Sequence, residues 1–323
     1  MISKPTVLVL GAGASADYGF RTGFQLLQQI FSDTKPNGKL QLFLRDEMTL
    51  PEAEIYRFNT ALGKSQAPSV DSFLEYRREF EQIGKLAIAA TLIPFEDGEK
   101  FILDKPQGWY SYLFGLMIQG GRFEDNPLSV VTFNYDRSLE AFFLLALCNL
   151  YGIQESDAEQ YLKRIPIIHL HGSLGDKLWK PPLASYRAYQ PDLTPAWVME
   201  AANHIKIIHE VNPGGEFDNA MKLLYQAAEV IFLGFGFLPD NVRRLGLAQV
   251  AKWREMDRRD PGNWFACPIG MGDGDVARVR SSLTVDIQFA VFRPRNITEY
   301  LKNTRCLMVS TPEAWFLLAG VEV

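Results

Sequence analysis

Short, continuous runs of apolar residues recur along the chain, and helix-like segments with apolar positions every three or four residues lie between them. Runs of about four to eight apolar residues are typical of strands buried on both faces of a sheet. Because these runs alternate with helical patterns, the sequence predicts an α/β fold with a doubly wound, mostly parallel sheet. The expected strands are Thr6–Leu10, Leu128–Phe133, Pro166–Leu170, Val230–Phe235, Trp264–Ile269 and Val285–Phe292.

Helical periodicity follows the first of these strands over a long stretch of the chain. A helix is expected over about Gly23–Phe31, and residues 39–121 show mainly helical patterns, which predicts a helical insertion or cap. The predicted domains are an α/β domain formed by residues 1–38 and 122–323, and the insertion over 39–121. The apolar stretch Phe142–Leu150 predicts a buried helix, because it is too short to span a bilayer.

A glycine-rich turn, Gly11–Ser15, follows the first expected strand directly and leads into the start of a helix. Gly11 permits a tight turn, and Gly13 lets the backbone approach a pyrophosphate without a Cβ in the way. The N–H groups at the start of the following helix point toward the negative charge. The turn therefore predicts a Rossmann-like dinucleotide site, although such turns are also common in α/β proteins that bind no ligand.

One feature of Rossmann dehydrogenases is not matched by the sequence. In those enzymes an acidic residue follows the glycines by about 20 residues, at the end of the next strand, and holds a ribose hydroxyl. Asp33 lies at about that distance, but in a turn-rich segment with no apolar strand before it. This departure disfavours hydride transfer.

Composition and charge narrow the class of protein further. The chain has 323 residues, 47% of them hydrophobic, and a net charge of −5, which fits an ordinary soluble enzyme with a large core. The mild acidity argues against direct nucleic-acid binding, because clustered Lys and Arg residues bind phosphate backbones. Cys148, Cys267 and Cys306 are too widely spaced for a Cys-x-x-Cys pair. No metal is therefore expected, and a reducing, cytoplasmic location fits.

Polar residues and glycines follow three of the later strands, at the carboxyl ends where open α/β sheets bind ligands. The three segments are Thr132–Arg137, His169–Ser173 and Gly234–Phe237. Each of them taken alone is explained as a turn. Their joint occurrence in this order favours a shared site.

In this order, the four segments resemble motifs of the sirtuin family. Gly11–Ser15 resembles the NAD phosphate loop of that family, and Thr132–Asp136 resembles its Thr-Gln-Asn-x-Asp motif. His171–Leu174 resembles the segment that bears the catalytic histidine, and Gly234–Gly236 takes the place of a Gly-Thr-Ser turn that binds ribose. The resemblance covers about half the chain and implies NAD as the substrate.

The resemblance carries over specific roles to residues of this chain. It implies that His171 and Asn134 are catalytic and that Asn134 and Asp136 belong to the nicotinamide pocket. A histidine with its ordinary pKa near neutrality can act as a general base, and an amide can hold the carboxamide or orient a water. His169 is expected to be a core residue or to support the site. The residues expected to bind NAD are Gly11, Ala12, Gly13, Ala14, Ser15, Phe20, Thr132, Asn134, Asp136, Gly172, Gly234, Phe235 and Gly236.

Departures from the family pattern decide which activity is favoured. Phe133 stands where the family has Gln, and the four zinc cysteines of the deacylases are absent from the sequence. The pattern is closer to sirtuin-like proteins of prokaryotic antiphage systems. That resemblance implies an NAD glycohydrolase that releases nicotinamide and ADP-ribose and depletes NAD. Two alternatives stay open: an NAD-dependent protein deacylase, and a non-catalytic sensor of NAD or ADP-ribose.

The chain is also expected to form a homo-oligomer, and the resemblance leaves room for a second defence-system protein as partner. No membrane partner is expected. The apolar segment Trp315–Val323 and the aromatic residues of the insertion would supply contacts, although both could instead pack within their own chain. The aromatic residues are Phe73, Tyr76, Phe80, Trp109, Tyr110, Tyr112 and Phe114.

Overall fold

The computed structural model describes residues 1–323 except 103–107, 176–177, 179–186, 208–214, 305 and 308–323. Its centre is a six-stranded, all-parallel sheet with the strand order β3-β2-β1-β4-β5-β6. The predicted α/β, Rossmann-like fold is therefore confirmed. The strands are β1 (Thr6–Leu10), β2 (Leu128–Thr132), β3 (Ile167–His169), β4 (Glu229–Leu233), β5 (Asn263–Ala266) and β6 (Ile287–Phe289).

Most strands are shorter than the apolar runs that predicted them. Residues at the ends of the later runs leave the sheet and form turns at its carboxyl edge. The neighbouring strands β2, β1 and β4 end at the same level, because Leu10 pairs with both Thr132 and Leu233. The polar and glycine-rich segments that follow these strands therefore begin side by side.

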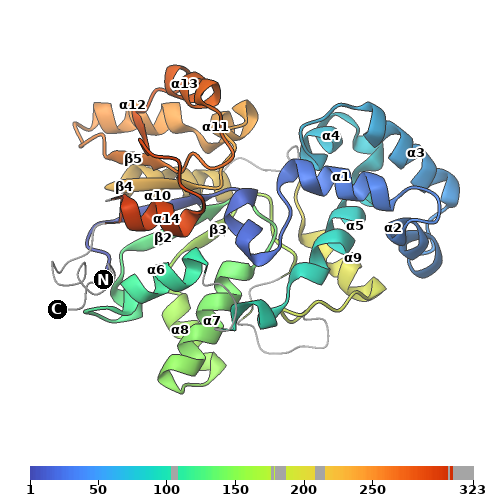
Figure 1. The fold of residues 1–323 in the computed structure, drawn as a ribbon, viewed down its shortest axis with the longest axis horizontal. Coiled ribbons are helices and arrows are strands. Elements are labelled where there is room, and N and C mark those ends of the chain that lie inside the picture. Colours follow the sequence, from blue (N-terminus) through green and yellow to red (C-terminus); the bar gives the residue numbers. More distant parts are fainter. Residues whose placement is uncertain (103–107, 176–177, 179–186, 208–214, 305, 308–323) are drawn as a thin grey trace.

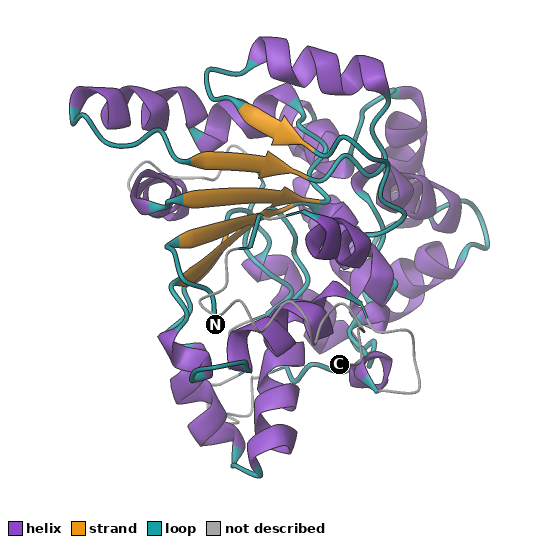
Figure 2. Ribbon diagram, turned by 60° about the vertical axis from the view of Figure 1, so that its left-hand side comes forward, coloured by secondary structure: helices purple, strands orange, loops and turns teal. Residues whose placement is uncertain are grey.

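Helices cover both faces of the twisted sheet (Figure 2). One face packs against α6 (Trp109–Ile118), α7 (Ser138–Tyr151), α8 (Glu155–Leu162) and α14 (Ile297–Asn303). The other face packs against α10 (Glu216–Gln226), α11 (Pro239–Leu245), α12 (Leu247–Met256) and α13 (Asp273–Ser282).

Alternate residues of β1 serve two separate apolar cores, as the two-residue period of a strand requires. Leu8 and Leu10 belong to one core, whereas Val7 and Val9 belong to the other. All five residues of β1 are buried. This explains why the sequence shows a continuous apolar run here and no alternation of apolar and polar residues.

A helical cap lies beside the carboxyl edge of the sheet and surrounds the largely buried helix α5 (Glu81–Leu92) (Figure 1). The cap includes α1 and α9, which lie outside residues 39–121, whereas α6 lies beside the sheet next to α7. Its helices are α1 (Gly23–Asp33), α2 (Lys39–Leu42), α3 (Glu52–Lys64), α4 (Val70–Tyr76), α5 (Glu81–Leu92) and α9 (Pro195–His204).

Aromatic residues of the predicted insertion lie mostly inside the protein. Phe73, Phe80, Trp109, Tyr110 and Phe114 are buried in the core that the cap shares with the sheet, whereas Tyr76 is exposed. The expected buried helix Phe142–Leu150 is part of α7. Trp315–Val323 lies outside the described residues. Within the described part of the chain, no helix is both long and apolar enough to cross a bilayer.

A buried ionic cluster connects the cap to the sheet domain. The Glu96 carboxylate, in the loop after α5, accepts hydrogen bonds from Arg137 Nε at 3.0 Å and Nη2 at 2.6 Å, and also from Arg187 Nη2. Arg137 directly precedes α7, and Arg187 lies between β3 and α9. All three side chains are at most 2% exposed. The cluster therefore holds three distant segments of the chain together.

We expect Glu96→Gln to lower the free energy of unfolding by about 3–5 kcal/mol, because it leaves two buried guanidiniums without a carboxylate. Urea denaturation measures the change. Glu99→Gln is the control, since Glu99 is exposed a few residues away. A loss below about 1 kcal/mol in Glu96→Gln would show that the cluster adds little beyond a surface ion pair.

Candidate functional site

The candidate site lies at the carboxyl edge of the sheet, where the strand order reverses between β1 and β4. From β1 the chain moves outward to β2 and β3, and from β4 it moves the other way to β5 and β6. In open α/β sheets, the loops that follow two such strands separate and leave a crevice for ligands. Here those loops are the Gly11–Ser15 turn and the Gly234–Phe237 turn.

The two turns contact each other backbone to backbone. The N–H of Gly11 donates to the carbonyl of Leu233, and that of Gly13 to the carbonyl of Gly234, both at 3.1 Å. A Cβ on Gly13 would lie 2.9 Å from the Cα of Gly234, which itself adopts a positive φ of 59°. Backbone packing, in addition to any pyrophosphate, therefore requires glycine at these positions. A short 3-10 helix, η1 (Ala12–Tyr18), follows.

Asn134 is fixed by the Gly11–Ser15 turn from across the β1–β2 pair. Its Nδ2 donates to the Gly11 carbonyl and to Ser15 Oγ, each at 3.1 Å, and its backbone N–H donates to Thr132 Oγ1. The side chain is 7% exposed, and its Oδ1 has no hydrogen-bond partner in the described structure. Such an atom costs free energy unless a ligand or water satisfies it.

Asp136 lies behind Asn134 in a buried polar network. Its carboxylate accepts hydrogen bonds from the backbone N–H and the hydroxyl of Ser138, and the Ser138 hydroxyl also bonds to Tyr110. Burial raises the pKa of Asp136, and these hydrogen bonds partly counteract it. The adjoining cavity has a volume of only about 10 Å³. It is too small for any part of a dinucleotide.

His171 lies directly after β3 in an aromatic surrounding and is 4% exposed. Its ring centroid is 5.6 Å from that of Phe133 and 6.0 Å from that of Phe217. Burial lowers the pKa of His171, with Asp71 acting in the opposite direction and Arg244 in the same one. The imidazole is therefore neutral at pH 7, and its Nδ1 has no partner among the described residues.

Gly172 fixes the backbone beside His171. It has a φ of 71°, and a Cβ there would lie 1.9 Å from the carbonyl oxygen of His204 at the end of α9. The carbonyl of His171 accepts a hydrogen bond from the N–H of Lys206. The catalytic candidate is therefore held between the sheet and the cap helix α9.

His169, which the sequence places in the core or in support of the site, has defined partners. Its Nδ1 lies 2.8 Å from the carbonyl oxygen of Asn134, and its Nε2 lies 2.6 Å from Glu140 Oε1. Burial disfavours the charged ring, but the Glu140 carboxylate outweighs this and raises the pKa of His169. A protonated His169 donates both bonds and fixes the backbone of Asn134.

The remaining predicted binding residues have different surroundings. Phe235 packs on Phe133 with ring centroids 5.1 Å apart, and Phe133 also contacts His171. Phe20 packs on Phe95, 6.0 Å away between ring centroids, and so faces the cap. Ala14 accepts a hydrogen bond from Trp109 through its carbonyl, whereas the space around Gly236 is open.

Contacts from the cap reach the same edge of the sheet and involve residues that the sequence did not single out. The hydroxyl of Tyr135 donates to Asp71 on α4, and Arg244 Nη2 donates to Glu75 on α4 at 2.8 Å. Glu140 was missed as well. Its only sequence signal is a carboxylate within the otherwise apolar start of α7.

No family model matches the chain, and no curated protein matches it. Within the described ranges, no group of three or more His, Cys, Asp or Glu side chains is arranged to hold a metal ion. One of the four histidines of the chain, His209, lies outside these ranges.

The raised pKa of His169 gives the stability of the fold a defined pH dependence. The ordinary pKa is 6.5 and the folded one is higher, so the His169–Glu140 ion pair stabilises fully below pH 6.5. The contribution is lost as the pH rises through the folded pKa. We expect the free-energy difference between the parent and His169→Asn, measured by urea denaturation, to shrink from pH 6 to pH 9. A constant difference would contradict a charged His169.

Proposed function

We propose that this chain is an NAD glycohydrolase, which cleaves the bond between nicotinamide and ribose. One observation carries the proposal: Asn134 Oδ1 and His171 Nδ1 are both buried without hydrogen-bond partners in the described structure, after neighbouring strands. Asn134 follows β2 and His171 follows β3, at the same carboxyl edge of the sheet where the glycine-rich turn follows β1. Two buried polar atoms of this kind, one of them on a side chain that is hydrogen-bonded to the dinucleotide-type turn, suit a polar substrate.

Asn134 is suited to hold the leaving group or the water. Its Nδ2 already donates to Gly11 and Ser15, which leaves Oδ1 to accept a hydrogen bond from a substrate. An amide oxygen can accept a hydrogen bond from the carboxamide of nicotinamide or orient an attacking water. The fixed geometry means that little ordering is needed during the reaction.

His171 is suited to act as the general base. Because its pKa is lowered by burial, the ring is neutral at pH 7 and its Nδ1 can accept a proton from water or a ribose hydroxyl. The ring is almost fully buried, so substrate access requires local opening near the cap. This requirement fits an NAD-depleting effector with a low resting turnover that rises when it is triggered, in line with the antiphage resemblance.

One assay distinguishes the three candidate functions, which are those of a glycohydrolase, a deacylase and a non-catalytic sensor. The purified protein is incubated with NAD, with and without an acetylated peptide, and nicotinamide release is measured. A glycohydrolase releases nicotinamide and ADP-ribose without peptide, a deacylase needs the peptide, and a sensor only binds NAD. Release that depends on the peptide would overturn the proposal in favour of the deacylase.

We expect His171→Ala to lower NAD turnover by roughly 10²- to 10⁴-fold while much of the NAD affinity remains, because a general base contributes about this much. In the parent protein, the acidic limb of the kcat/KM profile should lie below pH 6.5, since the pKa of His171 is lowered. Turnover of His171→Ala within threefold of the parent would remove His171 from the mechanism.

For Asn134→Ala we expect a strong loss of kcat together with a lower Tm, since its bonds to Gly11 and Ser15 are also lost. Asn149→Ala is the control, because the Asn149 amide is exposed on α7. A lower Tm with unchanged kcat would mean that Asn134 only stabilises the turn.

A further inference from the structure

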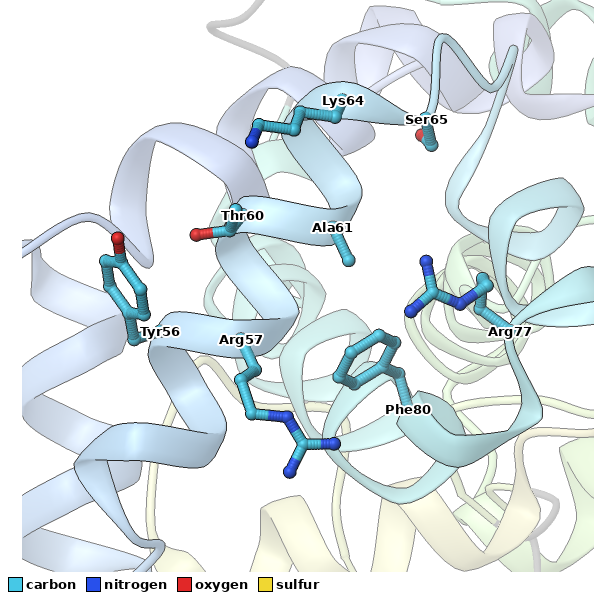
Figure 3. Close-up of a pocket in the computed structure, with 8 residues that line it drawn as sticks. All are labelled: Tyr56, Arg57, Thr60, Ala61, Lys64, Ser65, Arg77 and Phe80. Atoms are coloured by element: carbon cyan, nitrogen blue, oxygen red, sulfur yellow. The ribbon is translucent and has the colours of Figure 1, made fainter.

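A groove in the helical cap lies apart from the strand-end site. It has a volume of about 380 Å³, within the range of roughly 300–1,000 Å³ typical of small-molecule sites. One wall is a single face of α3, where lining residues recur four positions apart. The other wall lies just after α4 (Figure 3). The lining residues are Tyr56, Arg57, Thr60, Ala61, Lys64, Ser65, Arg77 and Phe80.

The charged residues that line this groove are all basic. Arg57, Lys64 and Arg77 line it, and no acidic side chain does. The Glu79 carboxylate accepts a hydrogen bond from Arg77 Nε at 2.6 Å, which leaves the Nη groups of Arg77 available, and it also interacts electrostatically with Arg57. Arg57 and Lys64 have no ion pair among the described residues. The groove therefore presents an excess of positive charge to a ligand.

Phe80 orders two of the three cations. The guanidinium carbon of Arg77 lies 5.0 Å from the centroid of the Phe80 ring, and that of Arg57 lies 6.0 Å from it. Phe80 itself is 3% exposed and is packed against Phe73 of α4. Figure 3 shows the Arg77 side chain extending toward Ala61 and Phe80. Guanidiniums held on a ring lose less conformational entropy when they bind an anion.

We propose that this groove binds a small phosphorylated ligand of the nucleotide class. Figure 3 shows the Phe80 ring between the Arg57 and Arg77 guanidiniums, so each of them can bind a different phosphate group of one ligand, since guanidiniums bind phosphate oxygens through paired hydrogen bonds. Lys64 adds a further cationic contact, and the exposed ring of Tyr56 offers a surface on which a base can stack. The proposal does not depend on the NAD glycohydrolase activity.

The size of the groove favours a small molecule over a protein partner. Stable protein interfaces bury roughly 800 Å² on each partner and contain apolar anchors. Here the eight lining residues enclose a compact volume, and the apolar side chains among them are Ala61 and Phe80 together with the ring of Tyr56. A phosphate beside a planar ring fits this combination of charge and aromatic surface.

Isothermal titration calorimetry of the full chain with ADP, pyrophosphate and adenosine tests the proposal. We expect ADP to bind, pyrophosphate to bind more weakly, and adenosine to bind at least tenfold more weakly than ADP. Arg57→Ala and Arg77→Ala should each raise the Kd for ADP about tenfold, which corresponds to about 1.4 kcal/mol. Arg78→Ala is the matched control, because Arg78 is exposed next to Arg77 but does not line the groove.

The variants also distinguish this groove from the strand-end site. ADP binding that is unchanged by Arg57→Ala and Arg77→Ala would overturn the proposal, since the ligand would then bind elsewhere. Absence of ADP and pyrophosphate binding at roughly millimolar concentration would overturn it as well. Arg77 also lies 6.0 Å from the ring of Phe73, so thermal melting must accompany its variant. Arg57→Ala removes an exposed side chain and remains informative if Arg77→Ala is unstable.

Discussion

The backbone contact between the Gly11–Gly13 turn and Gly234 is the constraint on which the candidate site depends. It closes the point where the strand order reverses, and it allows no side chain, because a Cβ on Gly234 would lie 2.0 Å from the backbone nitrogen of Ala14. The same turn presents the carbonyl of Gly11 and the hydroxyl of Ser15 to Asn134. The orientation of the Asn134 amide therefore follows from how closely two loops approach each other.

The fold could be predicted from the sequence because the central strands β1, β2 and β4 are short, mostly apolar runs between turn residues. The Gly11–Ser15 turn, Asn134 and His171 could be proposed as candidates for the same reason, since they follow such runs closely. The partners of these residues could not be found, because contacts such as that between His169 and Glu140 join positions 29 apart. The requirement for glycine at position 13 could not be fully predicted either. It comes from packing against Gly234, and the sequence does not show that β4 lies beside β1.

Buried charges set the position of the cap more specifically than apolar packing alone. Glu96 contacts two arginines from separate segments, and the acidic face of α4 contacts Tyr135 and Arg244 at the edge of the sheet. Buried ion pairs add little net stability compared with apolar packing, but removing one partner is costly. Directional contacts of this kind favour one arrangement of cap and sheet over others that bury similar apolar area.

The apolar core that unites the cap with one face of the sheet has a consequence for how the protein unfolds. Phe58 of α3 and Leu8 of β1 belong to one continuous cluster of buried side chains. The cap is therefore not a detachable module, because its buried side chains and those of β1 belong to the same core. The opening of α5 and the opening of the central strands then belong to one cooperative unfolding event.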